Sequence, residues 1–144
     1  MTQVSEPRCV FTEGSITLPA GYREQTVNIL IAPSGPSLNI SRDQLRPDED
    51  FATYLVRQRE VLQKGLRKYQ ALDEQPAVLG DGLFHGITLL SCYHPQKGQT
   101  LHQRQAVFPV TASNVLIFTL ASSQALTEQD EAFFSACLSS YQHP

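Results

Sequence analysis

The segment Val115–Leu120 reads VLIFTL, six uncharged residues with apolar side chains at both odd and even positions. Because successive side chains of a strand point to opposite faces of its sheet, a strand with this sequence is apolar on both faces. Such a sheet needs cover on both sides. Two outcomes stay open: helices cover both faces completely, or part of one face remains available to a partner.

The residues before this segment predict strands followed by a helix. Strand-like stretches span 9–18, 26–31 and 38–41 and are separated by turns rich in proline and glycine. A helix is expected from about 50 to 68, because Phe51, Leu55 and Leu62 fall on one stripe at helical spacing. Acidic residues at its start suit the positive end of a helix.

The residues around and after the helix predict more strands and a second helix. Extended segments are expected at 71–79, interrupted by Pro76, and at 83–93, 99–110 and 114–121. A final helix is capped by Thr127, runs to about Ser140, and should bury Phe133 and Phe134. Strands joined by short turns pair antiparallel, so the order predicts one α+β domain over residues 1–144, with a mainly antiparallel sheet and two principal helices.

Composition excludes several classes of function. The chain has 144 residues, a net charge of −3 and scattered basic residues, so we expect no nucleic-acid partner. Its three cysteines show no metal-ligand spacing and are expected to be reduced thiols. Residues 1–7 lack a secretion signal, and no apolar run approaches the ~20 residues that span a bilayer. We therefore expect a soluble, cytoplasmic protein without stable membrane insertion.

No group of residues predicts catalysis. If Pro95–Gly98 is a four-residue loop, Cys92 lies opposite Leu101 and Ser91 opposite His102, which puts Cys92 and His94 on one sheet face and His102 on the other. A cysteine and a histidine without a third member or metal spacing read as a core thiol and an edge histidine. We expect no enzyme activity, no cofactor and no metal.

Glutamines interrupt two apolar rows. Gln58 lies on the helical stripe with Leu55 and Leu62, and Gln103 and Gln105 share one face of a strand. An amide can hydrogen-bond a partner without burying a charge. The other interpretation is that these glutamines lie at the margin of the apolar stripe.

Over its whole length the chain resembles the Eag (effector-associated) chaperones of bacterial type VI secretion, within the DcrB-related group. The resemblance rests on length, element order and local sequence in six segments: Phe11–Pro19, Thr26–Leu30, Asp50–Phe51, Arg57–Gln58, His102–Phe108 and Asn114–Leu120. It implies a PsbP-like α/β/α sandwich, a homodimer, and a concave sheet surface that receives hydrophobic helices. The clients it implies are N-terminal transmembrane segments of PAAR-containing toxins, held before loading onto the VgrG spike.

On this basis we expect one client-binding surface, formed by Val27, Ile29, Leu38, Ile40, Gln58, Leu62, Gln103 and Gln105. The alternatives are a scaffold whose apolar surface only makes a dimer, and a small-ligand binder that uses the sheet cavity. In the second alternative His85, His102 and Arg104 should converge on one face.

Overall fold

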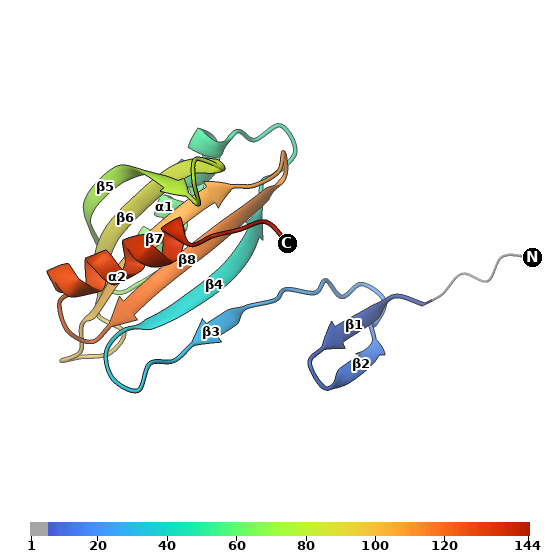
Figure 1. Ribbon diagram of the computed structural model, residues 1–144, viewed down its shortest axis with the longest axis horizontal. Coiled ribbons are helices and arrows are strands. Elements are labelled where there is room, and N and C mark those ends of the chain that lie inside the picture. The colour runs from blue at the N-terminus through green and yellow to red at the C-terminus, as the bar shows by residue number, and fades with distance from the viewer. Residues whose placement is uncertain (1–5) are drawn as a thin grey trace, which may run out of the picture.

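Eight strands and two helices make up the part of the chain that the structure, a computed structural model, describes, residues 6–144 (Figure 1). Residues 1–5, where we expected no secretion signal, lie outside it. The elements are β1 (Arg8–Phe11), β2 (Gly14–Thr17), β3 (Asn28–Leu30), β4 (Ser37–Gln44), α1 (Phe51–Gly65), β5 (Gln70–Leu79), β6 (Phe84–Tyr93), β7 (Leu101–Pro109), β8 (Asn114–Ser122) and α2 (Glu128–Ser139).

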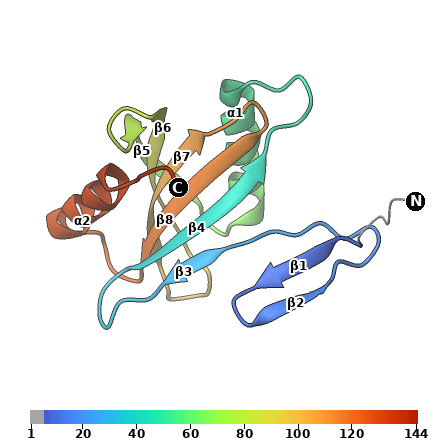
Figure 2. The same ribbon diagram turned by 45° about the vertical axis from the view of Figure 1, so that its right-hand side comes forward.

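The main sheet has six antiparallel strands in the order β3-β4-β8-β7-β6-β5, while β1 and β2 form a separate hairpin. Helix α1 lies on one side of this sheet and α2 on the other (Figure 2). The predicted α+β fold, an α/β/α sandwich with an antiparallel sheet and two principal helices, is confirmed. That all 144 residues form one domain stays a prediction.

Strand β8 lies inside the sheet and feeds two cores. Phe118 and Leu120 pack with Phe134 of α2, on what we call the α2 face. Val115 packs with Tyr54 of α1, on what we call the α1 face. The apolar character of β8 at both odd and even positions is thus used on both sides, as its sequence required.

Helix α1 begins close to residue 50, as expected, and α2 begins at its predicted cap, Thr127. The Asp50 carboxylate accepts a hydrogen bond from the Thr53 amide at 2.8 Å, and Thr127 forms a reciprocal capping box with Asp130. Helix α1 ends at Gly65, three residues earlier than expected, because Leu66 is already extended and Lys68 has a φ of 54°. The chain turns there into β5.

Two local predictions were wrong. Pro76 does not interrupt the strand, and β5 runs unbroken through it. Because β5 is an edge strand, no neighbouring strand needs an N–H donor from its outer side, so proline is tolerated there. Phe133 was expected in the core but is 53% exposed, whereas Phe134 is 2% exposed. Neighbouring residues on a helix point about 100° apart, so only one of the two faces the sheet.

The register of the β6–β7 hairpin also differs from the prediction. Cys92 lies opposite His102 and Ser91 opposite Gln103, so Cys92 and His102 share the α2 face. The connection is longer than four residues, because β6 ends at Tyr93, which pairs with Leu101. His94 therefore belongs to the connection and not to the strand.

We expect Gly86→Ala to destabilise the fold. A Cβ at this position would lie 1.9 Å from the Val107 carbonyl oxygen and 2.8 Å from a ring carbon of Phe108, two atoms that belong to strand backbone and core. Overpacking of this kind costs about 1–3 kcal/mol, and sometimes more. Urea unfolding measures the loss. The control is Gly65→Ala, where nothing lies within 4 Å, and an unchanged Gly86→Ala protein would contradict the packing described.

We expect the salt bridge before α1 to make stability depend on pH. Hydrogen bonds from the Arg57 side chain, and then from the Arg46 amide, lower the pKa of Glu49 from 4.5 to about 2. A carboxyl with a lowered folded-state pKa stabilises the fold above its unfolded pKa and loses that effect as the pH falls. Urea midpoints should therefore separate wild type from Glu49→Gln at pH 6 and separate them less at pH 3. Glu60→Gln, exposed on the same helix, is the control.

Candidate functional site: the groove between α1 and the sheet

A groove lies between α1 and the α1 face of the sheet. Its walls are mostly apolar and its volume is about 70 Å³. The helix contributes Tyr54, Leu55, Gln58, Arg59 and Leu62, and the sheet contributes Ile87, Leu89, Gln105, Val107 and Ile117. We call this set the α1 groove. It combines an apolar wall with two of the amides that the sequence pointed to.

One carboxylate positions the helix side of the groove. Asp43, on β4, accepts a hydrogen bond from the Tyr54 hydroxyl at 2.8 Å and one from Gln58 Nε2 at 3.0 Å. Burial, and then the neighbouring Asp43 carboxylate, raise the pKa of the Tyr54 phenol, so the hydroxyl stays a donor. Within the described residues no hydrogen bond engages the Gln58 carbonyl oxygen, which leaves it able to accept one.

A row of residues crosses the α1 face of the sheet beside the groove. The register places Ile29, Asn39, Thr119, Gln105 and Leu89 opposite one another on five neighbouring strands. Gln105 Nε2 donates to Thr119 Oγ1 at 3.3 Å. The Asn39 Oδ1 atom is buried and has no hydrogen-bond partner among residues 6–144. The row therefore has apolar residues at its two ends, Ile29 and Leu89, and polar residues between them.

The structure brings five of the eight expected client-binding residues to the α1 face. Gln58, Leu62 and Gln105 line the α1 groove, and Gln103 lies two residues from Gln105 on the same face of β7. Ile29 ends the row across the sheet and is 62% exposed. These residues lie on three elements that are distant in the sequence.

The other three residues are not part of this set. Val27 precedes β3 and is 48% exposed. Leu38 and Ile40 occupy the opposite, α2 face, where Leu38 is 5% exposed and Ile40 packs against the same core. The even residues of β4 face α2, so the assumed phase of this strand was off by one residue. We therefore leave Leu38 and Ile40 out of the surface considered below.

The residues of the small-ligand alternative do not converge. His85 is on the α1 face of β6, because it is two residues from Ile87, whereas His102 and Arg104 are on the α2 face of β7. Arg104 is also occupied, with its Nε 3.0 Å from a Glu131 oxygen. The α1 groove is smaller than the roughly 300–1,000 Å³ of typical ligand pockets.

Sequence reasoning missed three residues that belong to the groove, to the row beside it, or to the contacts that position them. Asp43 was not singled out, although it holds both Tyr54 and Gln58. Leu89 and Thr119 were seen only as parts of apolar strands. Both residues have odd numbers, like Gln105 and Val107, and the odd-numbered residues of these strands share one face of the sheet. The sequence shows this only once the register of the hairpin is known.

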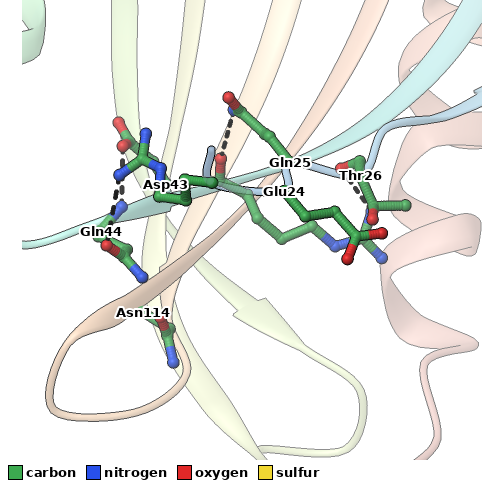
Figure 3. Close-up of a pocket in the computed structure, with 8 residues that line it drawn as sticks. Glu24, Gln25, Thr26, Asp43, Gln44 and Asn114 are labelled. Carbon is green, nitrogen blue, oxygen red and sulfur yellow. Dashed lines mark hydrogen bonds between the residues drawn. The ribbon is translucent and has the colours of Figure 1, made fainter. Parts of the chain in front are cut away.

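A second, more polar cavity of about 250 Å³ lies where residues 23–26 run beside β4 (Figure 3). It is lined by Arg23, Glu24, Gln25, Thr26, Arg42, Asp43, Gln44 and Asn114. No residue of the expected client-binding set lines it. Across residues 6–144, none of the helices has the length and apolar character needed to cross a membrane.

Comparison with known proteins identifies relatives of the whole fold. A protein from Pseudomonas aeruginosa named "Effector EagT6" is 34% identical over 118 residues, which are 78% of this chain and 79% of that protein. A crystal structure of a Pseudomonas aeruginosa protein of unknown function superposes with a TM-score of 0.68 and 26% identity, covering 96% of this chain and 97% of the other.

A cyanobacterial PsbP from Synechocystis gives a TM-score of 0.43 at 12% identity, over 92% of this chain and 86% of its own, which is too distant to carry an argument. The model of the DcrB family matches residues 13–140. Together with the EagT6 relative, this confirms the resemblance to the Eag group and shows that the chain belongs to the DcrB family.

Proposed function

We propose that this protein is an effector chaperone of type VI secretion that binds hydrophobic transmembrane helices of a PAAR-containing toxin before the toxin is loaded onto the VgrG spike. The observation that carries the proposal is the α1 groove, where an apolar wall and two amides lie side by side on a broad sheet face. The similarity to the protein named "Effector EagT6" gives the role its context.

The physics of the client explains why a chaperone is needed. A spanning helix of ~20 residues is ~30 Å long and ~10 Å across. Its flank presents about 900 Å² of apolar surface, which costs on the order of 20 kcal/mol in water. A cost of this size would drive aggregation or insertion into the wrong membrane unless another protein covers the helix.

The groove suits a helix more than a small molecule. Its own volume is small, but it continues along the sheet into the row that ends at the exposed Ile29. A helix lying on this surface would contact apolar side chains such as Leu62 in the groove and Ile29 at the end of the row, and the polar middle of the row between them. The unengaged carbonyl of Gln58 would accept a hydrogen bond from a polar group of the helix, without a buried charge.

The remaining parts of the proposal follow from this role. The protein acts as a homodimer, because two copies enclose more of a helix pair than one. It acts in the cytoplasm, where effectors are made, and it works by binding and not by catalysis. VgrG is an indirect partner, met only when the client is handed over.

We expect Leu62→Glu to abolish client protection, because a carboxylate in the groove would have to be desolvated against the client helix. The test is co-expression with the membrane-segment-bearing N-terminus of a PAAR effector, measured as soluble, co-eluting client on size exclusion. Val61→Glu is the matched control, since the neighbouring Val61 is 55% exposed on another side of α1. Client recovery should survive this control and be lost with Leu62→Glu.

Two results would contradict the proposal. The client could be equally soluble without the protein, or it could be soluble with it but never co-elute. A further result, equal loss with Leu62→Glu and Val61→Glu, would place the client on a surface other than the α1 groove.

A further inference from the structure

A cavity lined by basic side chains lies at one end of the main sheet. Its volume is about 320 Å³, at the lower end of the range for pockets that hold a ligand. Two connections form its walls, residues 66–69 between α1 and β5 and residues 94–100 between β6 and β7. The cavity, which we call the basic cavity, is lined by Arg67, Lys68, His94, Lys97, Gly98 and Thr100.

Hydrogen bonds fix the two walls of the basic cavity. The His94 amide donates to the Arg67 carbonyl oxygen at 2.9 Å and joins one connection to the other. Within the second connection the Gln99 amide donates to the Gln96 carbonyl oxygen at 3.0 Å. His94 Nδ1 lies 3.0 Å from the Gln99 carbonyl oxygen, and because a carbonyl oxygen only accepts, Nδ1 carries the hydrogen. The backbone of both connections therefore shapes the cavity.

The cations of the basic cavity have no anionic partner. Within residues 6–144 none of Arg67, Lys68 and Lys97 forms a salt bridge. The sequence explains this, because residues 61–72 and 82–127 contain no aspartate or glutamate, although the whole chain has a net charge of −3. The third lysine of the chain, Lys64, is in the last turn of α1, just before the first connection. Positive charge concentrated in this way favours an anionic ligand.

The basic cavity lies beyond one end of the α1 groove. Leu62 lines the groove, and α1 ends three residues later at Gly65, shortly before Arg67. On the sheet side Leu89 lines the groove, and β6 ends at Tyr93, roughly 13 Å further along at about 3.3 Å per residue. A spanning helix of ~30 Å that lies in the groove is long enough to reach the cavity.

We propose that the basic cavity binds carboxylate side chains of the client, in the segment that follows the C-terminal end of its hydrophobic helix. The C-terminal end of a helix itself carries a negative partial charge, which the same cations stabilise. Apolar contact in the α1 groove has no direction, so it cannot decide which way round the client helix lies. The basic cavity makes that decision, and it places the C-terminal end of the client helix beside the end of α1.

Two other anionic partners fit the basic cavity less well. An anionic membrane is a broad surface, and its headgroups would have to enter a cavity between two connections on a protein that is itself negatively charged. Inorganic phosphate is commonly held by backbone amides that converge on one point, as at a helix N-terminus or in a nest. Here the cations come from three separate side chains, which suits several carboxylates spread along a peptide.

This inference deepens the proposed function and rests on it for the identity of the partner. Carboxylate binding is measured first without a client, so a negative result there overturns the basic cavity and leaves client binding at the α1 groove standing. If wild type fails to recover the client, the proposed function falls and the client falls as the partner of the cavity. The peptide result then still decides whether the cavity binds carboxylates.

The first experiment measures carboxylate binding by the full chain. The probe is a peptide of alternating glutamate and serine that carries an uncharged fluorophore, read by fluorescence anisotropy and by amide NMR shifts. We expect saturable binding, with shifts at residues 66–69 and 94–100, and a loss of about tenfold in affinity with Lys97→Glu, because like charges repel. Lys64→Glu is the matched control, since Lys64 does not line the cavity. A peptide of alternating glutamine and serine should not bind.

A second variant separates charge from backbone conformation. Lys68 has a φ of 54°, which glycine adopts without strain, so Lys68→Gly removes the ammonium group and keeps the turn. It should weaken peptide binding without lowering the urea midpoint. If Lys97→Glu is not folded by circular dichroism, Lys97→Gln replaces it.

Three results of the peptide experiment would overturn the inference: no saturable binding, shifts only outside the two connections, or equal weakening by Lys64→Glu and Lys97→Glu. Inorganic phosphate and phosphatidylglycerol vesicles are measured in parallel. Binding of either that Lys97→Glu abolishes, without binding of the glutamate peptide, would assign the cavity to that anion instead.

The last experiment tests the direction of the client helix. The client N-terminus is co-expressed in two versions, with glutamates added either after the C-terminal end of its hydrophobic helix or before the N-terminal end. We expect wild type to retain the first version longer on size exclusion, and Lys97→Glu to lose this preference. Lysines added after the C-terminal end should instead favour Lys97→Glu over wild type. Equal retention of the two glutamate versions by wild type would refute the proposed direction.

Discussion

A strand that is apolar on both faces is the constraint on which the rest of the molecule depends. Because β8 presents Val115 to one side and Leu120 to the other, neither face of the sheet can be left to water, and one helix must lie on each side. The two helices do not cover the sheet equally. Helix α2 covers the larger of the two cores. Helix α1 packs against its face of the sheet through Tyr54 and leaves the α1 groove between itself and the sheet.

The polar contacts around α1 keep that groove from collapsing. Asp43 holds Tyr54 and Gln58 at fixed distances from β4, so the helix is positioned by hydrogen bonds as well as by apolar contact. An apolar groove without such fixed points would close by side-chain rearrangement, since protein interiors reach crystal-like packing density. Fixed amides also give a bound partner a defined place to donate and accept hydrogen bonds.

Much of the fold could be predicted from local signals. Helical spacing around Leu55 and Leu62, the cap at Thr127 and the apolar strands each depend on a few neighbouring residues. The family resemblance rested on the same kind of local pattern. What could not be predicted was the phase of β4 and of the β6–β7 hairpin, because register depends on the number of residues in a connection. Leu38 was expected on the client-binding surface but lies in the core, and His102 was expected on the face opposite to Cys92 but shares its face. Asp43 was missed for a related reason: its partners are on a helix that only the tertiary structure brings near.

The two edges of the main sheet differ in a way that limits how far copies can associate. β5 carries Pro76, a bulge between Ala71 and Asp73, and the acidic Glu74, all of which hinder the addition of another strand. β3 carries neither a proline nor a bulge nor a charge, and only its length of three residues limits pairing there. Pairing of two copies at β3 would leave only the protected β5 edges at the two ends, so it would stop at two copies and would not continue into a filament.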